Sequence, residues 1–114
     1  MTTKGIEGVL VETHNWGKTA RFFQALGYEP EFTTDHNSGL FRNGDGPYVF
    51  IAEIPNNQTP RTQLVLTVAD ADADAFQPNS DLDVVTLFEA THYGTKEMTV
   101  RDPDGRTWSL QSQG

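Results

Sequence analysis

One succession of predicted elements occurs twice in this 114-residue chain. A β-branched segment at residues 6–13 precedes a helical pattern and three further strand-like segments, and the same order restarts at residue 63. Gly8 and Gln63, which lie in equivalent first segments, are 55 positions apart, whereas Tyr48 and Thr107 in the last segments are 59 apart. The two offsets agree within the error of predicted element boundaries, and a near-constant internal period is typical of repeated structural units. The sequence therefore predicts an α+β fold of two β-α-β-β-β modules in tandem.

The first half carries the clearest helix signals. Asn15 is a typical N-cap residue, and Gly27 stands where helices commonly end in a left-handed residue. Residues at helical spacing lie between them, namely Thr19, Phe22, Phe23 and Leu26. Further strands are expected at residues 28–34, 39–42 and 48–54 of this half, and at 63–68, 83–89, 96–101 and 107–111 of the other.

The connection from Pro55 to Pro60 is polar and has no apolar periodicity, so it is the expected seam between the halves. We expect a single domain over residues 1–114, with halves at about 5–54 and 62–113. In the second half, Asp70 is expected to cap a short helix. Asp102-Pro-Asp-Gly105 is typical of a tight turn between antiparallel strands, because proline fixes one φ and glycine accepts a positive φ.

Each predicted half has one helix to cover one face of its strands, so the other face stays open, and two such faces would form a cleft in an open, curved mixed sheet. Side chains alternate between the faces of a strand. If Val9 and Val11 pack beneath the helix, Leu10 and Glu12 face the cleft with Gly8. In the second half the same rule places Gln63, Val65, Thr67, Thr107, Ser109 and Gln111 in the cleft, and Leu64, Leu66, Val68, Trp108 and Leu110 in the core.

Composition excludes several classes of function. The net charge of −8 repels the phosphate backbone of nucleic acids and anionic lipid surfaces, so neither is an expected partner. No cysteine is present, which excludes disulfides, thiolate zinc sites and a cysteine nucleophile. No apolar stretch approaches the roughly 18 residues of a membrane span, and no signal-peptide pattern is seen. These features favour a cytoplasmic protein.

Two stretches carry a family resemblance. The first comprises residues 8–11, 19–23 and 26–30, and the second runs from Tyr93-Gly to the turn at Gly105. Over nearly its whole length the chain resembles the vicinal oxygen chelate superfamily, which includes glyoxalases, bleomycin resistance proteins and extradiol dioxygenases. It is most similar to the bleomycin-resistance type, in which an aromatic residue followed by glycine, here Tyr93-Gly94, often lies at the cleft edge. The resemblance also implies a homodimer in which one chain covers the cleft of the other.

The resemblance implies metal ligands on the first and last strands of each half, usually histidine and glutamate. In this sequence those positions hold Gly8, a residue between Phe50 and Ala52, Gln63 and Ser109. A catalytic metal needs about three anionic or imidazole ligands and an open position. Glycine offers no side chain, and glutamine and serine are weak neutral donors. The sequence therefore predicts a protein without a metal or other cofactor.

The leading hypothesis is a metal-free, non-catalytic protein that binds a small molecule, for example by sequestering an antibiotic or another aromatic or cationic compound. Aromatic stacking would then supply affinity, although a phenylalanine is more often interior. The expected ligand-binding residues are Leu10, Glu12, Phe32, Phe41, Tyr48, Phe50, Gln63, Thr67, Tyr93 and Ser109. Two alternatives stay open. One is a glyoxalase-like lyase or isomerase with an atypical or metal-independent site, whose acid–base residues would be Glu12, His92 and Glu97. The other is a subunit or regulatory domain that only keeps the fold.

Overall fold

The computed structural model describes residues 2–91 and 94–113 and shows an α+β chain. Within these residues, eight strands and two helices follow one another as strand, helix and three strands, and then in the same order again. The chain separates into two compact units. The first is Gly8–Thr62, and the second joins the residues up to Glu7 with those from Gln63 onward. None of the helices in the described part of the chain is long and apolar enough to cross a membrane.

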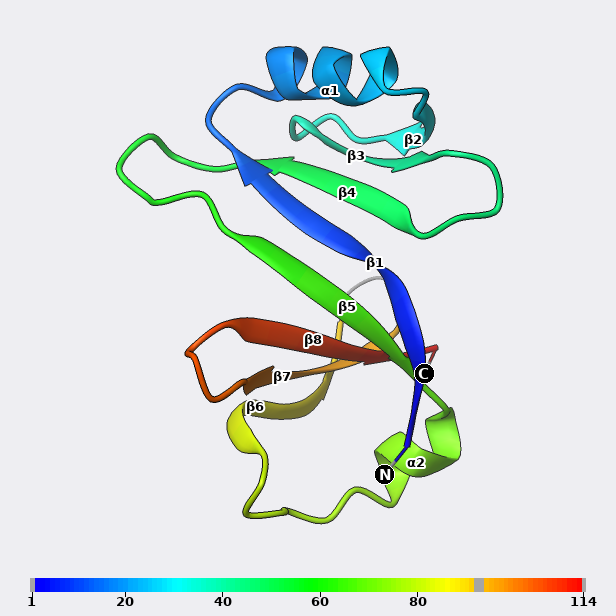
Figure 1. The fold of residues 1–114 in the computed structure, drawn as a ribbon, viewed down its shortest axis with the longest axis vertical. Coiled ribbons are helices and arrows are strands. Elements are labelled where there is room, and N and C mark those ends of the chain that lie inside the picture. The colour runs from blue at the N-terminus through cyan, green and yellow to red at the C-terminus, as the bar shows by residue number, and fades with distance from the viewer. Residues whose placement is uncertain (1, 92–93, 114) are drawn as a thin grey trace. The chain divides into compact units, whose positions relative to one another are not determined.

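In the first unit the strand order is β2-β3-β4-β1 (Figure 1). The elements are β1 (Thr3–Thr13), which begins in the other unit, α1 (Trp16–Ala25), β2 (Glu29–Thr33), β3 (Ser38–Arg42) and β4 (Tyr48–Glu53). β1 runs parallel to β4, whereas β3 is antiparallel to both of its neighbours. The predicted mixed sheet is therefore confirmed in this unit.

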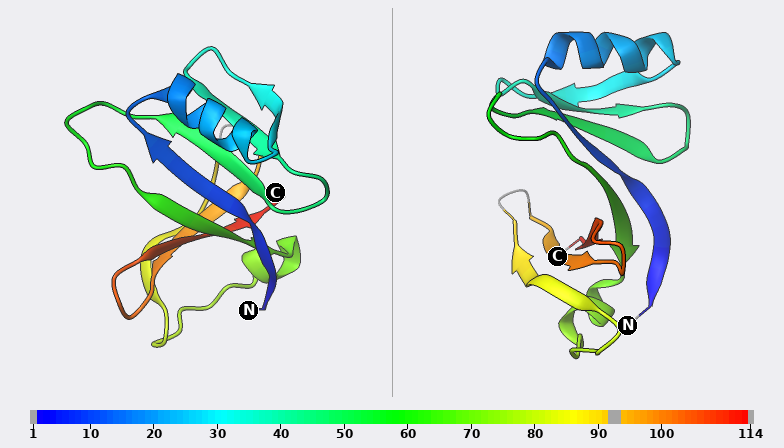
Figure 2. Two further views of the ribbon diagram at one scale, coloured as in Figure 1. Left: turned by 45° about the horizontal axis from the view of Figure 1, so that its top comes forward. Right: turned by 60° about the vertical axis from the view of Figure 1, so that its left-hand side comes forward.

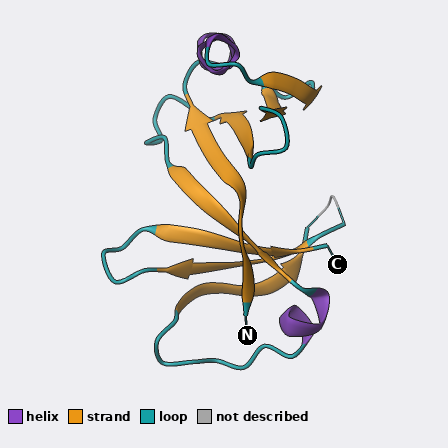
Figure 3. Ribbon diagram, turned by 45° about the vertical axis from the view of Figure 1, so that its right-hand side comes forward, coloured by secondary structure: helices purple, strands orange, loops and turns teal. Residues whose placement is uncertain are grey.

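In the second unit the strand order is β5-β8-β7-β6. The elements are β5 (Thr62–Val68), α2 (Asp70–Asp74), β6 (Asp83–Ala90), β7 (Lys96–Arg101) and β8 (Thr107–Ser112). β5 is parallel to β8, and the remaining pairs are antiparallel. Figure 3 shows that each unit consists mainly of strands and has one helix of its own.

Helix α1 starts and ends where the sequence indicates. Asn15 is the N-cap, with its side chain accepting a hydrogen bond from the Lys18 amide at 3.0 Å, and Gly27 follows the helix with a φ of +97°. The buried stripe differs from the expected one. Phe22 and Leu26 are 59% and 58% exposed, and the side chains that pack on the sheet are Trp16, Ala20 and Phe23. Their spacing of four and three residues is that of one helix face.

The core of the first unit lies between α1 and one face of its sheet. Phe41, Val49 and Ile51 are buried there, and Val9 and Val11 pack against them as predicted. Two views show α1 running along that one side of the sheet (Figure 2). Since strand side chains alternate, the neighbours of these core residues project from the opposite face, which α1 does not cover.

The core of the second unit also confirms the predicted alternation. Val68 and Leu110 are buried in it with Met98, and Leu66 and Trp108 pack against it. The predicted cap of α2 is wrong. The helix begins at Asp70 itself, the N-cap is Ala69, and no side chain caps the helix. Asp70 instead lies in the first turn, where the positive end of the helix favours a carboxylate.

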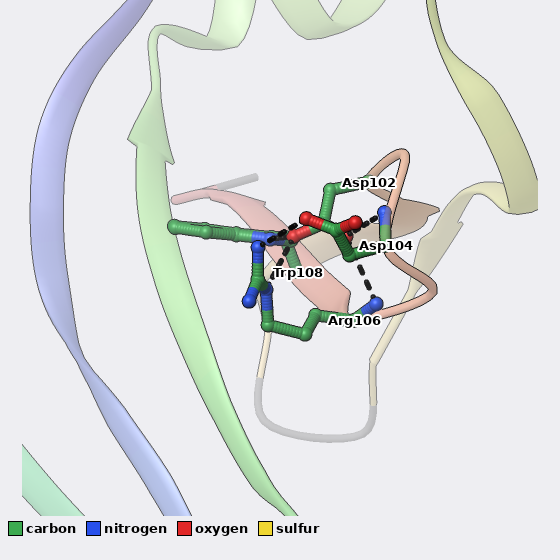
Figure 4. Close-up of polar contacts among 4 residues, drawn as sticks. All are labelled: Asp102, Asp104, Arg106 and Trp108. Carbon is green, nitrogen blue, oxygen red and sulfur yellow. Dashed lines mark hydrogen bonds and ion pairs between the residues drawn. The ribbon is translucent and has the colours of Figure 1, made fainter.

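The turn Asp102-Pro-Asp-Gly105 joins the antiparallel strands β7 and β8, as predicted. The Gly105 amide donates to the Asp102 carbonyl at 2.9 Å, and Gly105 has a φ of +89°. The Asp102 carboxylate accepts from Trp108 Nε1 at 2.9 Å and from Arg106 Nε at 2.8 Å (Figure 4). These two donors, with the Arg106 and Asp104 amides, hold the pKa of Asp102 far below its usual range.

We expect Asp102→Asn to lower Tm by several degrees at neutral pH. The asparagine side chain is uncharged, and its NH2 group cannot accept hydrogen bonds as the replaced carboxylate oxygen does. A carboxylate with a lowered pKa stabilises the fold above its unfolded pKa of about 3.9 and loses that effect as pH falls. The difference in Tm between wild type and Asp102→Asn should therefore shrink between about pH 5 and pH 2. Thermal unfolding by circular dichroism measures it.

Asp104→Asn is the matched control, because the Asp104 side chain is exposed and its one polar contact among the described residues is with Arg106 Nη2, at 3.1 Å. Its profile should follow the wild type. Equal pH profiles for the Asp102 and Asp104 variants would contradict the assigned role of Asp102.

Candidate ligand-binding face

Four apolar side chains form a row across the uncovered face of the first unit. The strand register pairs Phe32 with Leu40, Leu40 with Phe50, and Phe50 with Leu10. The row therefore crosses β2, β3, β4 and β1 in turn. We call these residues the apolar row. Their chain neighbours Phe41, Val49 and Val11 belong to the core on the other side, which fixes the direction of the row.

The apolar row is accessible at one end and partly buried along its length. Phe32 on edge strand β2 is 48% exposed, and its ring centroid lies 6.3 Å from that of Phe50. Leu10, Leu40 and Phe50 are partly buried. Rings at this separation present faces and edges on which a third aromatic group can pack.

One flank of the row is closed by an aromatic ring. Gly8 pairs with Tyr48 in the parallel register, and a Cβ atom on Gly8 would lie 2.5 Å from the Tyr48 ring. The Arg42 guanidinium also lies over this ring, with Cζ 5.9 Å from the centroid. Arg42 also forms an ion pair with Glu31, at 3.2 Å between Nε and Oε1.

The other flank holds a second ion pair. Glu12, two residues after Leu10 on β1, accepts hydrogen bonds from the Arg61 amide at 3.0 Å and from Arg61 Nε at 3.1 Å. The Glu12 side chain is only 15% exposed. The Arg61 side chain binds both oxygens of the Glu12 carboxylate and holds it in place. Glu12 is thus a charged residue of the predicted binding surface, but its carboxylate is already paired.

Glu53, at the end of β4, has a structural role in this unit. It accepts hydrogen bonds from the Trp16 amide at 2.9 Å and from the Asn37 side chain at 3.0 Å. These bonds, that from Trp16 first, lower the pKa of Glu53. They tie the start of α1 to the β2–β3 turn, where Asn37 has a positive φ of 55°.

In the second unit the face opposite α2 is mainly polar, with the buried Val65 beside Ser109 as an apolar exception. Gln63 and Ser109 are buried, and Gln63 Oε1 accepts a hydrogen bond from Thr107 at 2.7 Å. The buried Ser109 hydroxyl has no hydrogen-bond partner among the described residues. The register places Thr67, Gln111 and Glu97 side by side along the same face. This unit therefore offers hydroxyl, amide and carboxylate groups, in contrast to the apolar row of the first.

Some predicted ligand contacts need correction. Phe41 is 2% exposed and packs in the core, 5.8 Å from Trp16 between ring centroids, so it does not reach the uncovered face. The predicted residues His92 and Tyr93 lie outside the described residues. Sequence reasoning also missed Leu40 and Arg42, which the alternation about Phe41 brings to the uncovered face.

Arg61 was missed as well, and the sequence carries a weaker signal for it. It contacts Glu12 from 49 residues away and directly follows the polar seam, which ends at Pro60. Its only indication is its position just before the strand that begins at Thr62.

The metal that the fold family implies does not fit these residues. Gly8 supplies no donor and is covered by the Tyr48 ring, while Gln63 Oε1 already accepts from Thr107. The residues between Phe50 and Ala52 carry only hydrocarbon side chains. Among residues 2–91 and 94–113, no three histidine or carboxylate side chains are grouped so as to hold a metal ion. We therefore derive no chemistry through a metal.

Comparison with solved structures identifies the fold. A glyoxalase/bleomycin resistance protein/dioxygenase superfamily member from Vibrio splendidus 12B01 matches with a TM-score of 0.69 and 18% identity, over 97% of this chain and 99% of that one. Methylmalonyl-CoA epimerase from Mycobacterium tuberculosis matches with a TM-score of 0.76 and 13% identity, over 98% of this chain and 89% of that one. The Mn(II)-bound glyoxalase from Novosphingobium aromaticivorans matches with a TM-score of 0.68 and 16% identity, over 97% of this chain and 39% of that one.

The chain therefore has the vicinal oxygen chelate fold, as its resemblance implies. No protein-family model and no curated protein sequence matches it. At these identities the likeness concerns the fold alone, so function has to be argued from the residues of this chain.

We expect Gly8→Ala to destabilise the protein by about 1–3 kcal/mol, because the added methyl group must displace the Tyr48 ring. Urea unfolding measures the change. In a Tyr48→Ser background the same substitution should cost less, because the ring is gone and the two sites are in direct contact. An equal cost in both backgrounds would show that Gly8 and Tyr48 do not interlock.

Proposed function

We propose that this chain binds a small aromatic molecule on the uncovered face of its first unit, without a metal ion. The observation that carries the proposal is the apolar row, in which Phe32, Leu40, Phe50 and Leu10 lie next to one another across four strands. Ligand sites are mostly apolar surfaces with a few placed polar groups, and here Tyr48 and Arg42 supply the latter. Sequestration of an antibiotic is one use that such a site would serve.

Several wider predictions belong to the same proposal. The identical element order in both units supports two tandem modules within one domain. A homodimer and a cytoplasmic location stay predictions, as do ligand contacts by Gln63, Thr67 and Ser109. Gln63 and Ser109 are buried, so Thr67 and Gln111 are the more accessible polar groups on that face.

A lyase or isomerase is the second candidate. The observation in its favour is the Ser109 hydroxyl, buried without a partner on the same face as Glu97, as polar groups near a reacting centre often are. Against it, the Glu12 carboxylate is held by Arg61 and is poorly placed to take a proton from a substrate. The binding proposal rests on more of the described residues.

Substitution of Phe32 tests the binding proposal. Phe32→Ser removes the exposed ring of the apolar row and should weaken binding of an aromatic ligand by about 1 kcal/mol or more, or about fivefold in Kd. Isothermal titration calorimetry against a panel of polycyclic aromatic compounds, with EDTA present, measures the effect.

The matched control is Phe22→Ser, which removes a similarly exposed phenylalanine from α1, away from the row. It should leave Kd unchanged. Absence of binding across the panel, or equal losses in the two variants, would contradict the proposal. Dependence of binding on an added divalent metal would contradict its metal-free part.

A further inference from the structure

We infer that Asn43 is a site of spontaneous deamidation, in which its side-chain amide reacts with the backbone of Gly44, and that the product destabilises the end of α1. Both residues are exposed in the turn between β3 and β4. Asparagine is a thermolabile residue in proteins. Of the six asparagines in the chain, Asn43 alone is followed by glycine, which has no side chain to shield its amide nitrogen.

The reaction needs water and no other reagent. The Gly44 amide nitrogen attacks Cγ of Asn43, a C–N bond forms, and the side-chain nitrogen leaves as ammonia. The product is a cyclic succinimide. Water then opens the ring at one of its two carbonyl carbons. One opening gives aspartate, and the other gives isoaspartate, in which the backbone runs through the former side chain. No oxidant or reductant takes part.

Two aspartate–glycine turns could form the same ring, at positions 45–46 and 104–105, but hydrogen bonds oppose it there. The Gly46 amide donates to the Asn43 carbonyl at 3.3 Å, and the Gly105 amide donates to the Asp102 carbonyl at 2.9 Å. Such a bond must break before the nitrogen can attack, which slows ring closure. The structure therefore protects both of these glycine amides.

The Gly44 amide has no such protection. It makes no hydrogen bond within the described part of the chain, and a Cβ atom on Gly44 would have no neighbour within 4 Å. The Asn43 side chain also forms no hydrogen bond to a described residue. The side chains of Asn15, Asn37 and Asn79, in contrast, are each held by one. Both reacting groups are therefore free to meet only at Asn43.

The new carboxylate would lie at the end of α1. A Cβ atom on Gly27, which follows the helix, would be 3.3 Å from Asn43 Nδ2. The carboxyl end of a helix is negative, and the last turn of α1 has no basic residue to offset a further negative charge. Isoaspartate also adds one carbon to the backbone of a turn across which Arg42 Nη1 donates to the Gly46 carbonyl at 3.3 Å. Both products should therefore lower the stability of the first unit.

Peptide mapping by mass spectrometry on the full chain tests the inference. During incubation in buffer, the peptide that contains Asn43 should gain about one mass unit and become a substrate for isoaspartyl methyltransferase. The attacking nitrogen must first lose its proton, so the rate should rise about three- to tenfold between about pH 7 and pH 8. The other asparagines should keep their amides over the same time.

Incubation of the same chain in urea is the matched comparison, because unfolding releases the Gly46 and Gly105 amides from their hydrogen bonds. Isoaspartate at Asp104 should form in urea and be suppressed in the folded protein, whereas Asn43 should react in both states. Protection of Asn43 by folding, or conversion of Asn37 or Asn57 at the same rate in the folded protein, overturns the inference.

Asn43→Asp reproduces one product and tests the effect on α1. It should lower Tm by about 1–5 °C, as a negative charge at a helix carboxyl end does. The control Asn57→Asp makes the same change of charge at an exposed residue of the polar seam, and it should leave Tm unchanged. Equal Tm values for the two variants would overturn the inferred effect of the product on α1.

Discussion

The parallel register between β1 and β4 determines which side chains share the proposed binding face. It sets Leu10 beside Phe50 and Gly8 beside Tyr48, while Val9 and Val11 pair with the core residues Val49 and Ile51. A shift by one residue would exchange the two faces of the strand. The packing of α1 on Val49 and Ile51 prevents that shift, so the buried core of the first unit specifies the chemistry of its uncovered face.

The positions at which the family resemblance implies metal ligands have other roles in this chain. The Gly8 position is filled by the ring of Tyr48, and Gln63 accepts a hydrogen bond from Thr107. Gly8 makes room for the Tyr48 ring, and the Gln63 side chain takes part in local hydrogen bonding. The two units differ in the face that lies opposite their helix. Hydrocarbon and aromatic side chains form a row on this face of the first unit, whereas hydroxyl, amide and carboxylate groups predominate in the second, with the buried Val65 among them.

Alternation along the first strand assigned Leu10 to the face away from the helix, whereas Phe41 was expected to bind ligand on account of its aromatic ring alone. Alternation within the strand could not have decided the matter, because Leu40 and Phe41 are adjacent apolar residues in a five-residue strand and either could face the core. Gly39 resolves the choice in the structure. A Cβ atom there would lie 3.0 Å from the Trp16 ring, so Gly39 and Phe41 face α1 and Leu40 does not. That contact joins two distant elements and leaves no local pattern.

The ion pairs on the flanks were also beyond local patterns. Arg61 reaches Glu12 across 49 residues, and Arg42 reaches Glu31 across the irregular pairing of β2 with β3. Such pairs depend on how loops and strand ends are placed, which hydrophobic periodicity does not encode. The turn at Asp102 shows the opposite case, because proline, glycine and aspartate determine it within a few residues.

Methyl chemical-shift mapping by NMR tests the central claim most directly, since it locates a ligand on the molecule without any substitution. On titration with naphthalenemethanol in the presence of EDTA, the methyl groups of Leu10 and Leu40 should shift together and saturably. Those of Leu26, exposed on α1, and Leu110, buried in the second unit, should stay in place. Saturable shifts at Leu26 or Leu110 with none at Leu10 and Leu40 would contradict the account.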